Sequence, residues 1–303
     1  MSEGIVPALD ELVALRRAAT GRRPPRRGRH GMSGQAPSPM RGRGMEYAES
    51  REYTQGDDAR HIDWRLTART GKPHTKLFQA ERERLTLIVA DTAPALYFGT
   101  RVRFKSVQAA RAGAVAAWAA VRDGDRIAAL RGSVREPPVV PASGTRGALR
   151  ALDALVRWYA RPPEEDSGLG VALDHADRLL RPGSRLLVLA DPASVLAQTP
   201  SRWPALAQHR EVIVLLLCDP FERDPPRARL PFRIERPATS TSATRIELDL
   251  AGSAQRARWQ TAFEGPLRDA AAVLARGGVR VRPLSTEMPS ESWLDLFEGT
   301  RAA

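Results

Sequence analysis

Carboxylates and arginines crowd a short stretch in the first quarter of this 303-residue chain. Asp57, Asp58 and Asp63 lie close together in the sequence, and Arg60 stands between them. Neighbouring carboxylates can perform general acid–base catalysis, and an arginine beside them would bind an anion. The alternative is structural: the aspartates cap turns and helices and pair with nearby arginines. Because acids and arginines are nearly balanced here, the structural interpretation is favoured.

A second set of aspartates follows short apolar runs. These residues are Asp91, Asp191 and Asp219, which come after the runs 85–90, 186–190 and 212–218. Runs of this length are typical of buried parallel strands, and open α/β sheets bind ligands at the carboxyl ends of their strands. The alternative is that each aspartate caps the turn or helix that follows its strand.

The elements that would position these aspartates alternate between strand and helix patterns. Strands are predicted at 85–90, 126–130, 186–190, 212–218 and 279–284, with a short edge strand at 138–140. Helices are predicted at 105–121, 145–159, 169–180 and 256–276. This alternation predicts an α/β fold, a Rossmann-like and mostly parallel sheet with helices on both faces. Cys218 ends one apolar run, so we expect a small core side chain there and no metal ligand.

Basic charge is concentrated near the N-terminus. Nine arginines and no acidic residue lie in the segment 12–45, which therefore carries most of the net charge of +12. A basic arm of this kind could contact phosphates, but no aromatic residue alternates with its arginines as a stacking platform would need. Nucleic acid is thus not the favoured partner. An amphipathic helix is predicted over 1–20.

Long apolar segments are missing from the sequence. No run reaches the roughly 18–20 residues that a membrane span requires. The first 20 residues also lack the uninterrupted apolar centre of a signal peptide. We therefore expect a cytoplasmic protein without a membrane span.

The segment 42–71 closely resembles the hallmark of the domain-of-unknown-function family 58. The resemblance is carried by Gly42, Gly44, Glu46, Tyr47, Arg51, Tyr53, Gly56, Asp57, Asp58, Arg60, Asp63, Trp64, Arg69 and Gly71. It continues through Glu81, 85–91, Phe98-Gly99-Thr100, Lys105 and Asp219-Pro220. Within the segment, one short helix is predicted over 59–70. Asp57 or Asp58 would cap it, Gly71 would end it, and Trp64 would anchor it on another part of the protein.

This resemblance implies a von Willebrand factor A-like domain over 85–285. An N-terminal helix and arginine-rich arm (1–44) and a signature segment packed on the core (45–84) would precede it, as a family-specific extension, and a tail (286–303) would follow. The resemblance also implies a MoxR-type AAA+ ATPase as partner, in chaperone-like assembly or metal insertion for an unknown client. We therefore expect a non-catalytic protein–protein interaction module and no enzyme. It would make contact through the carboxyl edge of the sheet and the exposed side of the signature helix. The alternatives are a hydrolase that uses Asp57, Asp58 and Asp63, or nucleic-acid binding through the arm.

The metal site that this resemblance implies is depleted in the sequence. Its first motif would be Asp-x-Ser-x-Ser, but the segment 91–95 has alanine at both serine positions. The second loop lacks the expected threonine, with Asp166 or Ser167 as substitutes, and the third position is Asp191. Because Mg²⁺ requires a full set of hard oxygen ligands, Asp91, Asp191 and Ser167 would hold at most a weak, water-rich ion. No cofactor is expected, and both aspartates are predicted mainly to cap loops.

Overall fold

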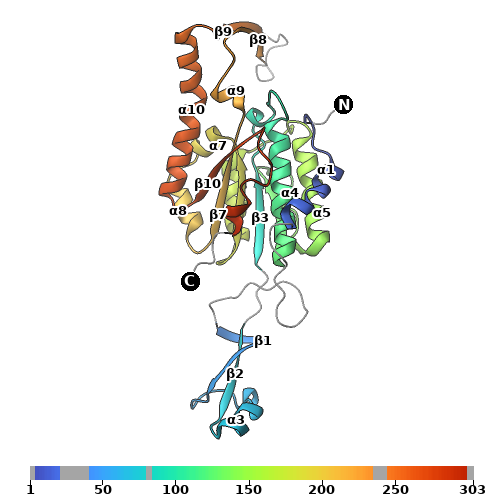
Figure 1. Cartoon of the computed structure of the whole chain (residues 1–303), viewed down its shortest axis with the longest axis vertical. Coiled ribbons are helices and arrows are strands. Elements are labelled where there is room, and N and C mark those ends of the chain that lie inside the picture. Colours follow the sequence, from blue (N-terminus) through green and yellow to red (C-terminus); the bar gives the residue numbers. More distant parts are fainter. Residues whose placement is uncertain (1–3, 21–40, 80–83, 235–243, 299–303) are drawn as a thin grey trace.

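A six-stranded sheet forms the centre of the computed structural model, which describes residues 4–20, 41–79, 84–234 and 244–298. The strand order is β10-β7-β6-β3-β4-β5. Figure 1 labels β10, β7 and β3 of this sheet. The strands are β3 (Leu85–Ala90), β4 (Arg126–Arg131), β5 (Ala142–Ser143), β6 (Arg185–Ala190), β7 (Glu211–Cys218) and β10 (Arg280–Ser285). Every pair is parallel except β4–β5. The predicted α/β fold with a mostly parallel sheet is confirmed.

The edge strand is the one strand of this sheet whose predicted position is wrong. It lies at Ala142–Ser143, antiparallel to β4, and not at 138–140. The residues around the predicted position include Pro137, Pro138 and Pro141. Because proline has no backbone N–H to donate to a strand ladder, this stretch cannot pair as a regular strand.

Alternating residues of each strand enter two separate cores. In β3, Ile88 and Ala90 belong to the core on one face of the sheet, while Leu87 and Val89 belong to the core on the other. This period of two explains why the strand is apolar on both faces, apart from Thr86 near its start. Cys218 is also buried among apolar side chains, as predicted.

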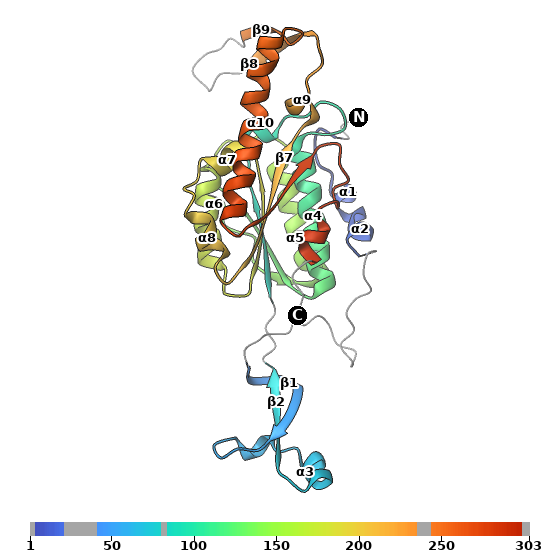
Figure 2. The same cartoon turned by 60° about the vertical axis from the view of Figure 1, so that its left-hand side comes forward.

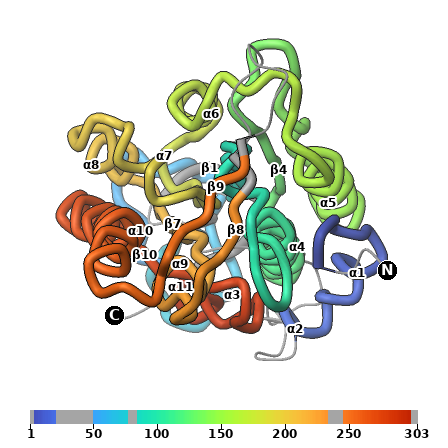
Figure 3. Tube along the Cα trace, turned by 90° about the horizontal axis from the view of Figure 1, so that it is seen from above, coloured from blue at the N-terminus to red at the C-terminus, as the bar shows by residue number. Residues whose placement is uncertain are grey.

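One face of the sheet is covered by two long helices and by both ends of the chain (Figures 2 and 3). These helices are α1 (Leu9–Ala14), α2 (Arg16–Thr20), α4 (Lys105–Asp123), α5 (Gly144–Tyr159) and α11 (Leu294–Glu298). The helix predicted over 1–20 is therefore two short helices. Leu12 and Ala19 are fully buried there, and Trp118 Nε1 donates to the carbonyl of Leu12 (3.0 Å).

The other face carries α6 (Gly168–Leu179), α7 (Pro192–Leu196), α8 (Arg202–Ala207) and α10 (Ser253–Arg276). On the carboxyl side of the sheet lie η2 (Pro94–Leu96), α9 (Pro220–Arg223) and the antiparallel hairpin of β8 (Arg229–Ile234) and β9 (Thr244–Asp249). Aromatic rings join the hairpin to the body: Phe221 packs edge-on against Trp259 (5.3 Å between centroids), and Phe232 contacts both. Within the described residues, no helix is both long and apolar enough to cross a membrane.

The signature segment forms a second antiparallel hairpin, β1 (Arg41–Glu52) with β2 (His74–Gln79). The single helix predicted over 59–70 is wrong: a 3₁₀ turn, η1 (Ala59–His61), is followed by α3 (Trp64–Thr70). The break arises because Ile62 has an extended backbone and forms a bridge with Thr75. Gly71 ends α3 in the left-handed region (φ 73°), as predicted.

The connections of this hairpin run through 21–40 and 80–83, which lie outside the described residues, as does most of the arginine-rich arm. That the signature segment packs on the α/β body therefore stays a prediction. The Trp64 side chain is 70% exposed among the described residues, so that it anchors α3 on another part of the protein also stays a prediction.

Candidate functional site

Three buried aspartates line the carboxyl edge of the sheet. Asp91, Asp191 and Asp219 directly follow β3, β6 and β7, which are neighbours in the sheet. In each, Oδ1 accepts a hydrogen bond from the backbone N–H two residues ahead: Ala93 (3.0 Å), Ala193 (2.9 Å) and Phe221 (2.9 Å). The predicted line of carboxylates is present, and its members make the predicted capping bonds.

A lysine lies among these carboxylates. Lys105, the first residue of α4, is 1% exposed, and its Nζ lies 3.0 Å from Asp191 Oδ2 and 2.6 Å from Glu222 Oε1. Burial alone would lower the pKa of Lys105, but the charges of Asp191 and Glu222 outweigh burial and raise that pKa above its ordinary value. Lys105 therefore stays protonated and completes a buried ion triad.

The second carboxylate oxygen of Asp91, of Asp219 and of Glu222 also accepts a hydrogen bond. Asp91 Oδ2 accepts from the backbone N–H of Asp191 (3.0 Å), and Glu222 Oε2 accepts from that of Asp219 (2.9 Å) in a capping box. Asp219 Oδ2 accepts from the hydroxyl of Thr286 (2.7 Å), while the hydroxyl of Thr100 donates to Oδ1 (2.6 Å). Burial raises the pKa of Asp91 to about 6.

A magnesium ion does not fit this set of donors. Each carboxylate oxygen of Asp91, Asp191, Asp219 and Glu222 already accepts a contact from the protein itself. The predicted third ligand is engaged elsewhere, because the hydroxyl of Ser167 donates to Glu165. Within the described residues, no three His, Cys, Asp or Glu side chains are arranged to hold a metal.

The carboxylates of the signature segment do not form a common site. Asp57 pairs with Arg51 (2.7 Å), Asp58 accepts from the backbone of Arg60 and caps η1, and Asp63 accepts from the backbone of Leu66 and caps α3. The backbone hydrogen bond from Thr54 lowers the pKa of Asp57, and the bond from Leu66 lowers that of Asp63. A general acid requires the opposite shift, so neither Asp57 nor Asp63 is suited to that role.

Two further signature residues shape the same hairpin. The backbone N–H of Tyr53 donates to the carbonyl of Pro73 (2.8 Å). Gly56 occupies the left-handed region (φ 109°) in the turn before η1, a conformation that other residues rarely adopt.

The outward face of α3 carries the exposed groups of this segment. Trp64 and Ala68 form one stripe along the helix, and Arg65 and Arg69 form the next. All four are exposed, and within the described part of the chain neither arginine has an acidic partner. Arg60, in the preceding turn, is exposed as well.

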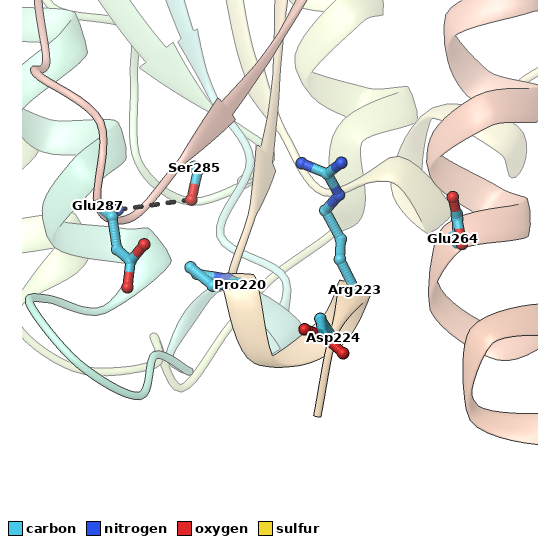
Figure 4. Close-up of a pocket in the computed structure, with 6 residues that line it drawn as sticks. All are labelled: Pro220, Arg223, Asp224, Glu264, Ser285 and Glu287. Atoms are coloured by element: carbon cyan, nitrogen blue, oxygen red, sulfur yellow. Dashed lines mark hydrogen bonds between the residues drawn. The ribbon is translucent and has the colours of Figure 1, made fainter. Parts of the chain in front are cut away.

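An open hollow of about 300 Å³ lies beside the ion triad, at the carboxyl ends of β7 and β10 (Figure 4). Its lining combines one guanidinium with three carboxylates, and no histidine or cysteine is among the lining side chains. The lining residues are Pro220, Arg223, Asp224, Glu264, Ser285 and Glu287. This composition offers charge for recognition.

Sequence reasoning missed Lys105, Glu222, Thr100 and Thr286 as members of the site. Two signals were present. Lys105 is one of three lysines in the chain and begins a predicted helix, where the helix dipole disfavours a cation. Glu222 stands three residues after Asp219, which is the spacing of a capping box.

The fold and site define an α/β protein in which Lys105 and hydrogen bonds hold the buried carboxylates at the carboxyl edge of the sheet. Residues 49–264 match the family described as "Protein of unknown function DUF58", and the chain belongs to this family. An uncharacterized protein of Mycobacterium bovis and uncharacterized proteins of two Mycobacterium tuberculosis strains, CDC 1551 and H37Rv, are each 32% identical to it over 193 residues. The matches cover 61% of this chain and 58% of each relative.

Proposed function

We propose that this protein is a non-catalytic protein–protein interaction module. Its α/β body would be von Willebrand factor A-like, and its partner would be a cytoplasmic MoxR-type AAA+ ATPase. The observation that carries the proposal is the exposed face of α3, where Trp64 lies beside Arg65 and Arg69, which have no acidic partner among the described residues. Tryptophan and arginine are the residue types most enriched among the energetic centres of protein interfaces.

The chemistry of this face defines the complementary surface. An indole this exposed leaves a large apolar area in water, which burial in a partner's slot would remove. Arg60, Arg65 and Arg69 would match carboxylates around that slot, and such charges speed association. The expected partner surface is therefore an apolar slot with an acidic rim.

The carboxyl edge supports the same interpretation in a different way. Its aspartates are held by backbone caps and by Lys105, so they position loops and leave no free acid or base. The neighbouring hollow, with Arg223 among Asp224, Glu264 and Glu287, would serve as a second, polar contact.

The two alternatives have weaker support. A hydrolase built on Asp57, Asp58 and Asp63 lacks a raised pKa, since those of Asp57 and Asp63 are lowered. Nucleic-acid binding through the arginine-rich arm rests on composition alone, and DNA binding that is unchanged and insensitive to salt after deletion of 21–44 would exclude the arm as its site.

The test is a pull-down of the full chain with an AAA+ ATPase of the MoxR type from the same organism, with and without ATP. We expect a nucleotide-dependent complex. Trp64→Ala should weaken the complex by about tenfold or more, as loss of an interface centre does. Arg65→Glu with Arg69→Glu should slow association, because the charges would then repel an acidic rim.

Val140→Ala is the matched control, because Val140 is 68% exposed but lies far from α3 in the sequence. It should leave the complex unchanged. Absence of any complex, or equal binding by wild type and Trp64→Ala, would refute the proposal.

A further inference from the structure

The carboxyl edge concentrates negative charge where little water reaches. Asp91, Asp191, Asp219 and Glu222 are all buried, and the sheet brings them together from loops after three adjacent strands. Buried carboxylates need a compensating cation or strong hydrogen bonds. Among these side chains, Lys105 supplies the cation, at 3.0 Å from Asp191 and 2.6 Å from Glu222.

Without its ion pairs, the position of Lys105 at the start of α4 would be unfavourable. The first turn of α4 carries no acidic residue, and its N-cap, Phe104, makes no side-chain cap. A helix N-terminus carries partial positive charge, so a lysine at the first helical position is repelled. Burial of an ammonium group adds to that cost. Asp191 and Glu222 compensate for both.

We propose that Lys105 is a resident cation: its ammonium group occupies the place that a divalent metal would need and makes this edge independent of metal. The ammonium joins the loop after β6, through Asp191, to α9 after β7, through Glu222, and to the start of α4. Because Glu222 also accepts from the backbone of Asp219, the constraint extends to the loops that hold Thr100 and Thr286.

The first experiment compares metal binding by the full chain and its variants after removal of divalent ions with a chelator. The probe is Mn²⁺ alone, followed by calorimetry and by electron paramagnetic resonance. Wild type should bind no Mn²⁺ at micromolar concentrations. Lys105→Ala removes the ammonium and leaves space beside Asp191 and Glu222, so it should bind Mn²⁺ at least about tenfold more tightly than wild type. Adding Asp191→Asn should abolish the gain.

Lys72→Ala is the matched control, because Lys72 also pairs with a carboxylate, Glu52 (3.1 Å), but at an exposed position. It should gain no Mn²⁺ binding. Micromolar Mn²⁺ binding by wild type that Asp91→Asn removes would overturn the proposal. Unchanged Mn²⁺ binding by folded Lys105→Ala would overturn it as well.

A second experiment covers the case in which Lys105→Ala does not fold. Lys105→Met keeps the length of the side chain and removes its charge, so the melting temperature should fall by on the order of 10 °C. Adding Asp191→Asn and Glu222→Gln removes the uncompensated negative charge and should recover part of that loss. No loss in Lys105→Met, or no recovery in the triple variant, would contradict a role as resident cation.

Discussion

Glu165 shows how hydrogen bonds, with the nearby Arg131 at 3.7 Å, hold a carboxylate in its charged form. The hydroxyls of Ser133 and Ser167 and the backbone N–H of Val134 all donate to it. These bonds, led by the one from Ser133, lower the pKa of Glu165 from 4.5 to about 2. Its carboxylate thereby joins the loop after β4 to the start of α6.

Glu165→Gln should therefore change the pH dependence of stability. Since the pKa of Glu165 is lower in the folded chain, its charged form stabilises the fold above about pH 4.5, and this contribution is lost as the pH falls towards 2. The variant should melt below wild type at neutral pH, and the difference should shrink on acidification. Glu164→Gln, at the exposed neighbouring position, should show neither effect. A difference that is the same at every pH would contradict this explanation.

Helix α11 combines a contact from far along the chain with one from its own flank. Phe297 is buried, its ring centroid lies 3.5 Å from the guanidinium carbon of Arg185, and it packs edge-on against Trp293 (5.8 Å). A segment expected only to be a C-terminal tail thus completes the core over α4.

Phe297→Ala should lower the free energy of unfolding by about 3–5 kcal/mol, because it leaves a cavity and removes the cation–π contact. Urea denaturation would measure the loss. Phe263→Ala on α10, where the ring is 37% exposed, is the matched control and should cost less. Equal losses in the two variants would mean that α11 contributes little to the core.

The elements that the sequence predicts best are those with a clear apolar pattern. The strand predicted at 85–90 has the bounds of β3, and the helix predicted at 145–159 differs from α5 by one residue, because each has a continuous apolar run or stripe. Both two-stranded hairpins, β1–β2 and β8–β9, went unrecognised. Their strands are rich in charged residues, and only β9 alternates strictly between polar and apolar residues.

The site was predictable only in part for a related reason. The aspartates could be located because each follows a strand, which is a local signal. The ion triad could not, because Lys105 is separated from Asp191 and Glu222 by 86 and 117 residues. No local sequence pattern indicates which loops meet at one edge of a sheet.

At the scale of the whole molecule, buried charge lies at both ends of the sheet, with apolar strands between. At the amino end, ion pairs join three arginines to three acidic residues. They are Arg84, Asp123, Asp125, Arg185, Glu211 and Arg280. Arg84 is the first described residue after the signature hairpin, so this network lies where the hairpin joins the body.

Asp125→Ala tests how much this network contributes. Asp125 lies 3.1 Å from Arg84 Nε and accepts from the hydroxyl of Thr86 (2.7 Å), and it faces Arg185 at 3.7 Å. Its removal leaves two arginines without that charge, one of them buried, so the free energy of unfolding should fall by about 3–5 kcal/mol. Because the contacts of Asp125 with Arg84 and Arg185 are shielded from solvent, added salt should hardly change this loss. Asp249→Ala, which breaks an exposed pair with Arg229, should cost about 0–1 kcal/mol. A loss of that small size in Asp125→Ala, or one that disappears in salt, would show that buried charge does not hold the amino end of the sheet.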